Sequence, residues 1–308
     1  MTPPTKIRPP SNKRWIVTAV PYLWMLVFFL VPFFIVLKIS FSSSMIAQPP
    51  YVPVFDPFGD PWSETLEKLG TLTSDNYLRL GQDSIYVSSY LSSLWIAGSS
   101  TVMMLFLAYP IAYGMARAPK SWRATLVMLV ILPFWTSFLI RVYAWISILS
   151  EEGLLNTLLT SLGLIDEPIQ ILSTNTAVYI GILYSYLPFM VLPLYSALEK
   201  MDDSLIEAAK DLGCTNIQAF WRVTFPLSIP GIIAGCFLVF IPAVGEFVIP
   251  DLLGGSETIM IGKTMWEEFF NNRDWPAASG VAIVLLIVLM IPIIIFQTSQ
   301  ARQQEAGR

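Results

Sequence analysis

The sequence predicts an all-α integral membrane protein with six transmembrane helices, and three observations support that prediction. The 308-residue chain is 55% hydrophobic and only 13% charged, with a mean hydropathy of +0.62, whereas soluble domains average about 25% charged residues. Six apolar runs are long enough to cross the hydrocarbon core as helices, which takes about 20 residues. The alternating segments of about ten residues that are typical of a membrane β-barrel are absent.

The six runs occupy, in chain order, 15–40, 87–115, 122–148, 175–198, 228–250 and 277–297. The first run is too long for the core of a signal peptide and has no small-residue cleavage site, so we expect it to remain as a span. Together the runs leave no room for a sizeable soluble domain. We therefore expect one membrane domain over 15–297, between cytoplasmic tails at 1–14 and 298–308.

Composition also excludes several functions. The chain has no histidine, so His-based metal sites and H-E-x-x-H proteases are excluded, and no metal site is predicted. Cys214 lies in a loop and Cys236 in a span, so they imply no disulfide framework. The net charge of −4 does not suggest a nucleic-acid partner. Gly262-Lys263-Thr264 resembles the end of a P-loop, but Glu257 occupies the position of the first glycine. We predict no cofactor for this chain itself, and any ATP must be bound by another subunit.

The basic residues predict the orientation, because Lys and Arg of short loops collect on the cytoplasmic side. Twelve of the 18 basic residues fall on one side: Lys6, Arg8, Lys13, Arg14, Arg117, Lys120, Arg123, Lys200, Lys210, Arg222, Arg302 and Arg308. The loop at 149–174 has four acidic residues and no basic one, as an outer loop would. Both termini are therefore expected in the cytoplasm, as an even number of spans requires.

The first outer loop, 41–86, is rich in Pro, Gly and aromatic residues, as in the stretch QPPYVPVFDPFGDPW. Its composition fits an ordered cap over the outer end of the protein. It fits a mobile loop equally well, and both readings stay open.

The cytoplasmic loop between the fourth and fifth runs carries helix signals over about 204–224. Ser204 with Glu207, and Thr215 with Gln218, have the spacing of capping boxes. Gly213 has the place of a helix stop, and the second helix is expected to end before Pro226. An apolar face at helical spacing is formed by Leu205, Ala208, Ala209 and Leu212. From the residues alone, the pair is either an ordinary connection on the membrane surface or a docking element for a cytoplasmic partner.

A family resemblance favours the docking element. The spacing Glu207-Ala208-Ala209-x₃-Gly213-x₉-Val223-x-Phe225-Pro226 resembles the EAA motif of ABC importer permeases, E-A-A-x₃-G-x₉-I-x-L-P, with Val and Phe as mild departures. The resemblance implies that Glu207, Ala208, Ala209 and Gly213 belong to a coupling helix. In that family the coupling helix sits in a groove of the ATPase subunit and transmits its movement to the membrane helices.

Charges inside spans are costly, so each needs a reason. Arg141 lies in the third run among Trp135, Tyr143 and Trp145, and its simplest role is an intramembrane salt bridge. Glu246 and Asp251 lie near the outer end of the fifth run and could be partners in such a bridge. Alternatively, Glu246, Asp251, Trp135 and Tyr143 line an acidic, aromatic path for a cation, because aromatic faces attract ammonium groups.

Two glycine-containing stretches of the fifth run have a structural reading. Gly245 with Pro242 and Pro250 suggests a broken helix end, and irregular backbone at membrane depth tends to line a cavity. Gly231 and Gly235 in GIIAG fit close helix packing.

A narrower resemblance covers about residues 15–297. The stretches LPFWTSFLIRVYAW, FIPAVGEFVIPDLLGG and EEFFNNRDWPAAS look like the polyamine branch of these permeases, and most like the putrescine permeases. The resemblance implies a type I ABC importer permease fold in a bacterial inner membrane and alternating-access import of putrescine. The implied partners are a second, homologous permease subunit, two ATPase subunits that bind ATP, a periplasmic polyamine-binding protein and membrane lipid. The alternatives are a spermidine or other-solute permease of the same fold, a secondary transporter, or an integral membrane enzyme.

Overall fold

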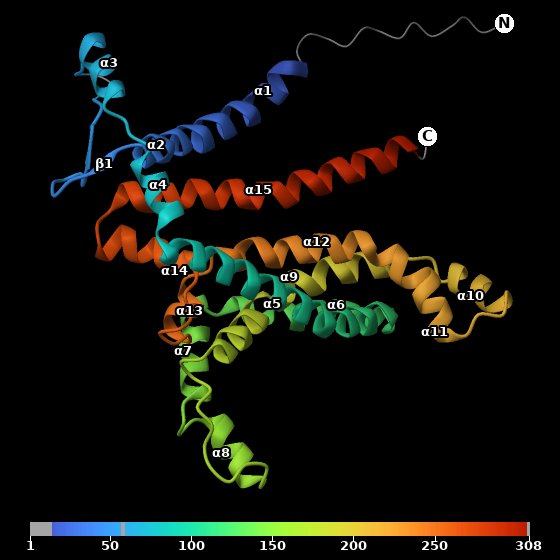
Figure 1. Ribbon diagram of the computed structural model, residues 1–308. Coiled ribbons are helices and arrows are strands. Elements are labelled where there is room, and N and C mark those ends of the chain that lie inside the picture. Colours follow the sequence, from blue (N-terminus) through green and yellow to red (C-terminus); the bar gives the residue numbers. More distant parts are fainter. Residues whose placement is uncertain (1–13, 57–58, 307–308) are drawn as a thin grey trace, which may run out of the picture. The chain divides into compact units, whose positions relative to one another are not determined.

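The computed structural model describes residues 14–56 and 59–306, and its backbone is mostly helical (Figure 1). The parts of the two predicted tails at 1–13 and 307–308 lie outside the described residues. The chain forms two compact units, the first built from the segments up to Gln82 and from Glu268 onward, the second from Asp83–Glu267. Each unit is described separately.

The first unit begins with a long apolar helix that contains one wide turn. Its elements are α1 (Arg14–Met25), the π-helical turn η1 (Leu26–Leu30) and α2 (Val31–Ser40). Thr18–Ser40 is long and apolar enough to cross a membrane. Pro32 stands in the first turn of α2, where its missing N–H breaks the regular bonding pattern. The π-helical turn directly before it absorbs that break.

The loop between the first two predicted spans, 41–86, has defined structure throughout its described part. Its elements are β1 (Ser43–Ser44), β2 (Tyr51–Val52), α3 (Trp62–Gly70) and α4 (Asp75–Gln82), with β1 and β2 antiparallel. The Asn76 amide donates to the carbonyls of Ser40 and Ser42 at 2.9 and 2.8 Å, which ties α4 to the end of α2. Of the two readings left open, the ordered loop is the one that the structure shows.

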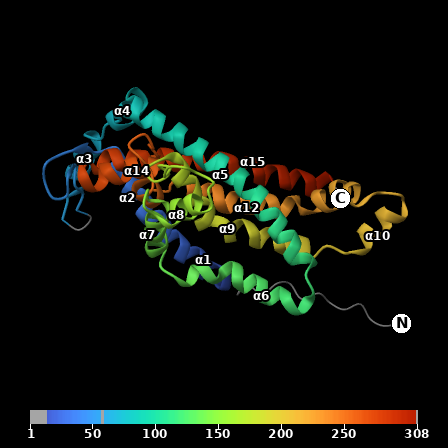
Figure 2. The ribbon, with the colours of Figure 1, turned by 90° about the horizontal axis from the view of Figure 1, so that it is seen from below.

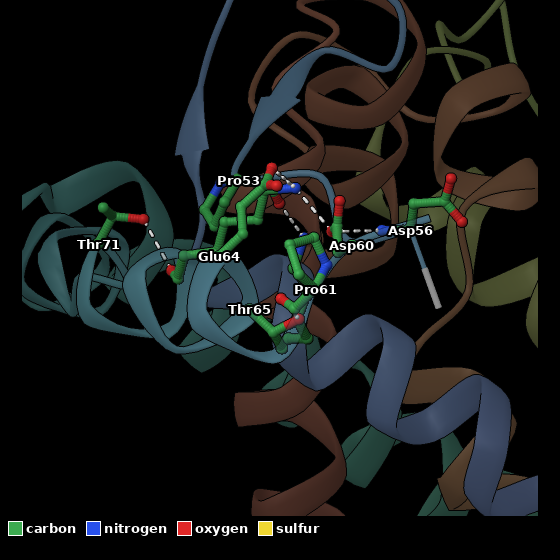
Figure 3. Close-up of polar contacts among 9 residues, drawn as sticks. Pro53, Asp56, Asp60, Pro61, Glu64, Thr65 and Thr71 are labelled. Atoms are coloured by element: carbon green, nitrogen blue, oxygen red, sulfur yellow. Dashed lines mark hydrogen bonds and ion pairs between the residues drawn. The ribbon is translucent and has the colours of Figure 1, made fainter. Parts of the chain in front are cut away.

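A small polar network holds α3 in place (Figure 3). Asp60 accepts from the Asp56 N–H at 2.9 Å and from the Lys68 ammonium at 2.6 Å, and Lys68 also pairs with Glu64 at 2.9 Å. The hydrogen bond from Lys68 holds the pKa of Asp60 below its ordinary value. Glu64 is exposed, and Asp60 and Lys68 are half-buried at the surface, so the network orders the loop without adding much stability.

The last helix completes the first unit. Its elements are η4 (Glu267–Asn271) and α15 (Trp275–Ala306), of which Trp275–Ile294 is a candidate span. Arg79 of α4 pairs with Asp274 at 2.9 Å, next to the start of α15. Leu80 of α4 lies against Gly280 of α15, so α4 packs directly on the last helix.

Three long helices form the core of the second unit: α5 (Ser84–Arg117), α9 (Asn175–Glu199) and α12 (Phe225–Val244). Gly231 and Gly235 lie where α12 meets α9, because a Cβ on either would come within 2.6–2.7 Å of Ala197 or Met190. This confirms the close packing that the GIIAG stretch predicts.

The third predicted run, 122–148, is not one continuous helix. Its segment comprises α6 (Lys120–Ile131), the 3-10 turn η2 (Leu132–Trp135), α7 (Phe138–Leu149) and α8 (Leu154–Ser161), and the chain bends by 87° between Trp135 and Phe138. Pro133 cannot donate a helix bond, and Thr136 has an extended backbone. The described residues give five continuous candidate spans, or six if the bent pair counts as one.

The shorter elements of the second unit lie at its two ends. They are α10 (Ser204–Asp211), α11 (Asn216–Ala219), the π-helical turn η3 (Phe220–Thr224), α13 (Val248–Leu252) and α14 (Ile261–Trp266). Both views place α10 beyond the ends of α9 and α12, with α14 at the opposite end of this unit (Figures 1 and 2).

Candidate functional site

The helix pair between α9 and α12, residues 204–224, forms a tight hairpin that turns at Gly213. Gly213 has a φ of +85°, a conformation that costs a residue with a Cβ about 1–2 kcal/mol. Its N–H donates to the Lys210 carbonyl at 2.8 Å, and the Cys214 N–H donates to Ala209 at 3.0 Å. These two backbone hydrogen bonds form the Schellman motif, in which a glycine ends a helix. The predicted helix stop is confirmed.

One predicted capping box is present and the other is not. Thr215 and Gln218 cap α11 reciprocally, with N···O distances of 3.0 and 3.3 Å. The box predicted at Ser204 is wrong, because the Ser204 N–H donates to the Asp202 carboxylate at 3.0 Å. A carboxylate is the stronger acceptor, and the N–H and hydroxyl of Ser204 lower the pKa of Asp202.

The second helix of the hairpin runs on into the membrane helix. We predicted that it would end before Pro226, and this is wrong: α11, η3 and α12 follow each other without a break, so that Asn216–Val244 is one candidate span. Pro226 stands in the first turn of α12, and the π-helical turn before it accommodates the missing N–H. The hairpin and α12 are therefore joined by a continuous helix.

The hairpin presents apolar side chains to its surroundings. Leu212 is 87% exposed and Ile217 72% exposed, and Glu207 and Ala208 are exposed beside them. An exposed apolar patch of this kind is typical of a protein interface. On its other side the hairpin is tied to the end of α5 by an ion pair between Asp203 and Arg117. The structure thus leaves the Glu207, Ala208 and Gly213 positions of the motif open to a partner, while Ala209 is half-buried.

A cavity of about 380 Å³ lies at the other end of this unit, between α7, α9 and the end of α12. It brings together Arg141 and Glu246, which are 105 positions apart in the sequence. The remaining residues that line it are Phe134, Phe138, Ser185, Tyr186, Phe189, Pro242, Gly245, Phe247 and Val248. The irregular backbone predicted at Gly245 does line a cavity.

Glu246 is 7% exposed, and its carboxylate is held by three donors. One oxygen accepts from the Tyr186 hydroxyl, and the other accepts from the N–H groups of Val248 and Ile249 at 3.0 and 3.3 Å. Glu246 therefore caps the start of α13 and at the same time places a negative charge at the cavity wall.

Arg141 lines the same cavity, but no salt bridge joins it to Glu246 within 4.0 Å. Its guanidinium carbon lies 5.0 Å from the ring centre of Phe134 and 5.7 Å from that of Phe138. The intramembrane salt bridge predicted for Arg141 is thus not formed among the described residues, where aromatic faces take the place of a carboxylate.

The other predicted path residues lie elsewhere. Trp135 and Tyr143 are exposed, and neither lines this cavity. Asp251 pairs with Lys263 at 3.5 Å. Tyr186, the donor to Glu246, was not predicted from the sequence. The one available signal was a hydroxyl in an otherwise apolar stretch, YSYLPFM, where such a group needs a partner.

The P-loop-like residues have a packing role. Gly262 lies in the first turn of α14 against the carbonyls of Gly245 and Glu246, and a Cβ there would be 2.7 Å from the Gly245 carbonyl carbon. Lys263 is engaged with Asp251. Gly262 therefore permits a close backbone approach behind the cavity.

The hairpin, the span that it continues and the cavity at the far end define a membrane transport subunit. Residues 12–303 match the family described as the binding-protein-dependent transport system inner membrane component, and the chain belongs to this family. It is thus a multi-pass inner-membrane permease component and not an enzyme.

Two relatives within this family show which branch of it the chain resembles. The chain is 39% identical to the spermidine/putrescine transport system permease protein PotB of Haemophilus influenzae over 93% of this chain and 94% of the relative. It is 46% identical to PotB of Escherichia coli strain K12 over 73% of this chain and 81% of the relative. The resemblance to the polyamine branch is thereby confirmed, but these relatives are named for spermidine as well as putrescine.

The fold comparison agrees. A solved bacterial ABC transporter that imports the acidic polysaccharide alginate matches 94% of this chain and 96% of its own with a TM-score of 0.67, at 17% identity. The same transporter type in complex with a periplasmic protein carrying alginate pentasaccharide gives a TM-score of 0.68. The chain has the type I ABC importer permease fold predicted from its sequence.

Proposed function

We propose that this chain is the transmembrane subunit of an ATP-driven importer of polyamines. The observation that supports it most strongly is the 39% identity to a spermidine/putrescine permease over 93% of the chain. The sequence resemblance pointed first to putrescine, with spermidine as an alternative. Because the relatives are named for both polyamines, the cargo we propose is spermidine and putrescine.

The proposed coupling runs from the hairpin through α12 to Glu246. Two ATPase subunits bind ATP, since this sequence has no Walker motif, and each permease subunit offers its hairpin to one of them. The exposed Leu212 and Ile217 supply the apolar contact. Because the hairpin continues as α12, which ends one residue before Gly245, a movement at the ATPase changes the cavity at the other end. Alternating access follows from that linkage.

The proposed partners and orientation follow from the same scheme. A second, homologous permease subunit completes the membrane pathway, and a periplasmic polyamine-binding protein delivers the cargo to the outer loops. Both termini face the cytoplasm, as the basic residues of the short loops indicate. The hairpin then lies on the cytoplasmic side and the cavity toward the outer side.

Glu246 is the proposed contact for a cargo ammonium. It is a buried carboxylate on a cavity wall that also carries the aromatic rings of Phe134, Phe138 and Phe189. A carboxylate binds an ammonium group, and aromatic faces add about 0.5–2 kcal/mol. Asp251, Trp135 and Tyr143 remain proposed path residues beyond this cavity.

The test is uptake of radiolabelled putrescine and spermidine by cells that lack their own polyamine systems and express this chain with its neighbouring operon products. Wild-type uptake that collapses in Glu246→Gln, at equal membrane levels, supports both the cargo and the acidic site. Unchanged uptake by the variant leaves Glu246 as the cap of α13 alone. No polyamine uptake by the wild type refutes the cargo, and uptake without the ATPase subunit would make the chain a secondary transporter.

A further inference from the structure

The cavity of the second unit contains a mostly buried guanidinium, two of whose three nitrogen atoms have no acceptor among the described residues. The Arg141 side chain is 8% exposed, and its Nε and Nη1 atoms are buried with no hydrogen-bond partner among the described residues. A guanidinium stays protonated in proteins and carries five donors. Burying such a group without a partner is strongly unfavourable. The rings of Phe134 and Phe138 interact with its charge, but they accept none of these hydrogen bonds.

Glu246 does not supply the missing acceptor in this arrangement. It lines the same cavity, yet its carboxylate already accepts from the Tyr186 hydroxyl and from two backbone N–H groups. These donors hold the carboxylate more than 4.0 Å from the Arg141 nitrogens, so pairing would require Glu246 to shift from its place at the start of α13. Asp251, the acidic residue next along the chain, is engaged by Lys263.

The proposed cargo does not supply it either. A polyamine carries ammonium groups, which are donors and cations, so they repel a guanidinium instead of pairing with it. Within this chain the cavity has one positive and one negative group, and therefore no net attraction for a cation. A site for a cation needs a further negative charge beside Arg141.

We infer that a carboxylate side chain of the second permease subunit enters this cavity and pairs with Arg141. Guanidinium and carboxylate form a two-pronged, charge-assisted hydrogen bond, which would satisfy one of the two buried donor atoms together with the neighbouring Nη2. The pair would neutralise Arg141 and leave the charge of Glu246 free to attract the cargo. The identity of the partner rests on the proposed function, while the need for an acceptor rests on the burial of Arg141.

The test uses the assembled complex, with a photoactivatable benzoylphenylalanine in place of Phe138 at the cavity wall. Irradiation is expected to join this chain to the second permease subunit, within a peptide that contains an Asp or Glu. Cross-links only within this chain, or only to the binding protein or to a second copy of this chain, overturn the inference.

Charge variants provide the second measurement. Arg141→Gln is expected to lower uptake about tenfold or more, because removing one member of a buried pair leaves the other charge unpaired. Exchanging the two charges, with Arg141→Glu in this chain and the cross-linked acidic residue changed to Arg, should restore most of the uptake. Arg123→Gln is the control, since Arg123 makes a solvent-exposed pair with Glu199 at 3.5 Å. The inference fails if Arg141→Gln behaves like the wild type, or if Glu246→Gln in the same chain rescues it.

The two proposals fail separately. A cross-link to an acidic peptide in a complex that imports no polyamine refutes the cargo and leaves the pairing intact. Polyamine import by a complex without that cross-link refutes the pairing of Arg141 and leaves the proposed cargo intact.

Discussion

The turn at Gly213 allows the coupling role to be tested with little disturbance of the fold. An added Cβ at this glycine would meet no atom within 4 Å, so Gly213→Ala introduces no clash. The substitution destabilises the turn only through the φ of +85°, a conformation that costs a residue with a side chain about 1–2 kcal/mol of free energy. Since 1.4 kcal/mol corresponds to a factor of ten, the turn would be occupied about 5- to 30-fold less relative to its alternatives.

We expect ATP-driven uptake to fall by up to that factor in Gly213→Ala, with normal amounts of protein in the membrane. Asn tolerates positive φ better than other residues with a side chain, so Gly213→Asn should stay close to the wild type. Gly213→Asp should abolish transport and leave insertion intact, because it adds a charge beside the exposed Leu212. The difference between Asn and Asp therefore isolates the charge from the backbone conformation.

Gly163 supplies the matched control. It also has a positive φ, of +66°, and no atom within 4 Å of an added Cβ, but it lies in the loop after α8. Gly163→Ala should destabilise its turn by a similar amount and leave polyamine uptake normal. Normal uptake by both Gly213→Ala and Gly213→Asp would refute the coupling role of the turn. Equal losses at Gly163 and Gly213 would show a general effect of strained glycines.

Two further substitutions test the packing and the cavity. Gly231→Ala would bring a methyl group to 2.6 Å from Ala197 and should destabilise the chain by about 1–3 kcal/mol, measured as a lower melting temperature in detergent. Gly114→Ala in α5, with open space around it, should not, and equal melting temperatures would contradict the packing argument. Tyr186→Phe removes a donor to Glu246, worth about 1.5–3 kcal/mol, and should reduce polyamine uptake. Tyr184→Phe should transport normally, so wild-type uptake by both tyrosine variants would contradict the role given to the hydroxyl.

Helix-end signals in the sequence led to correct predictions where a backbone N–H had only one nearby side-chain or carbonyl acceptor. The Thr215–Gln218 box and the turn at Gly213 depend on residues a few positions apart, and both are present. The Ser204 box failed because Asp202, two positions earlier, takes the same N–H. Spacing alone does not rank two neighbouring acceptors.

Proline effects were harder to predict, because every predicted span contains at least one proline. Pro226 was read as a helix end, yet a π-helical turn lets the helix continue across it. Pro133 marks the 87° bend of the third run, although the run is predominantly apolar on both sides of it. Hydropathy finds apolar length, and it carries no information on whether the freed backbone groups are satisfied within a helix or at a bend.

The cavity depended on long-range packing. Arg141 and Glu246 were singled out because charges in spans need a reason, and the structure brings them to one cavity. That they lie there without pairing was not predictable, since it depends on Tyr186 and the start of α13 occupying the Glu246 carboxylate. Trp135 and Tyr143 were chosen for their chemistry, and helical phase within the bent segment turns them away from the cavity.

The most direct measurement of the central claim is transport by the purified complex in sealed vesicles. This chain is reconstituted with the second permease subunit and the ATPase, loaded binding protein is added on one side, and ATP with Mg²⁺ is supplied on the other. The account predicts accumulation of radiolabelled spermidine and putrescine that stops when the ATPase is catalytically inactive or when Gly213→Asp is present. Accumulation that persists without ATP hydrolysis, or with Gly213→Asp at full ATPase assembly, would contradict it.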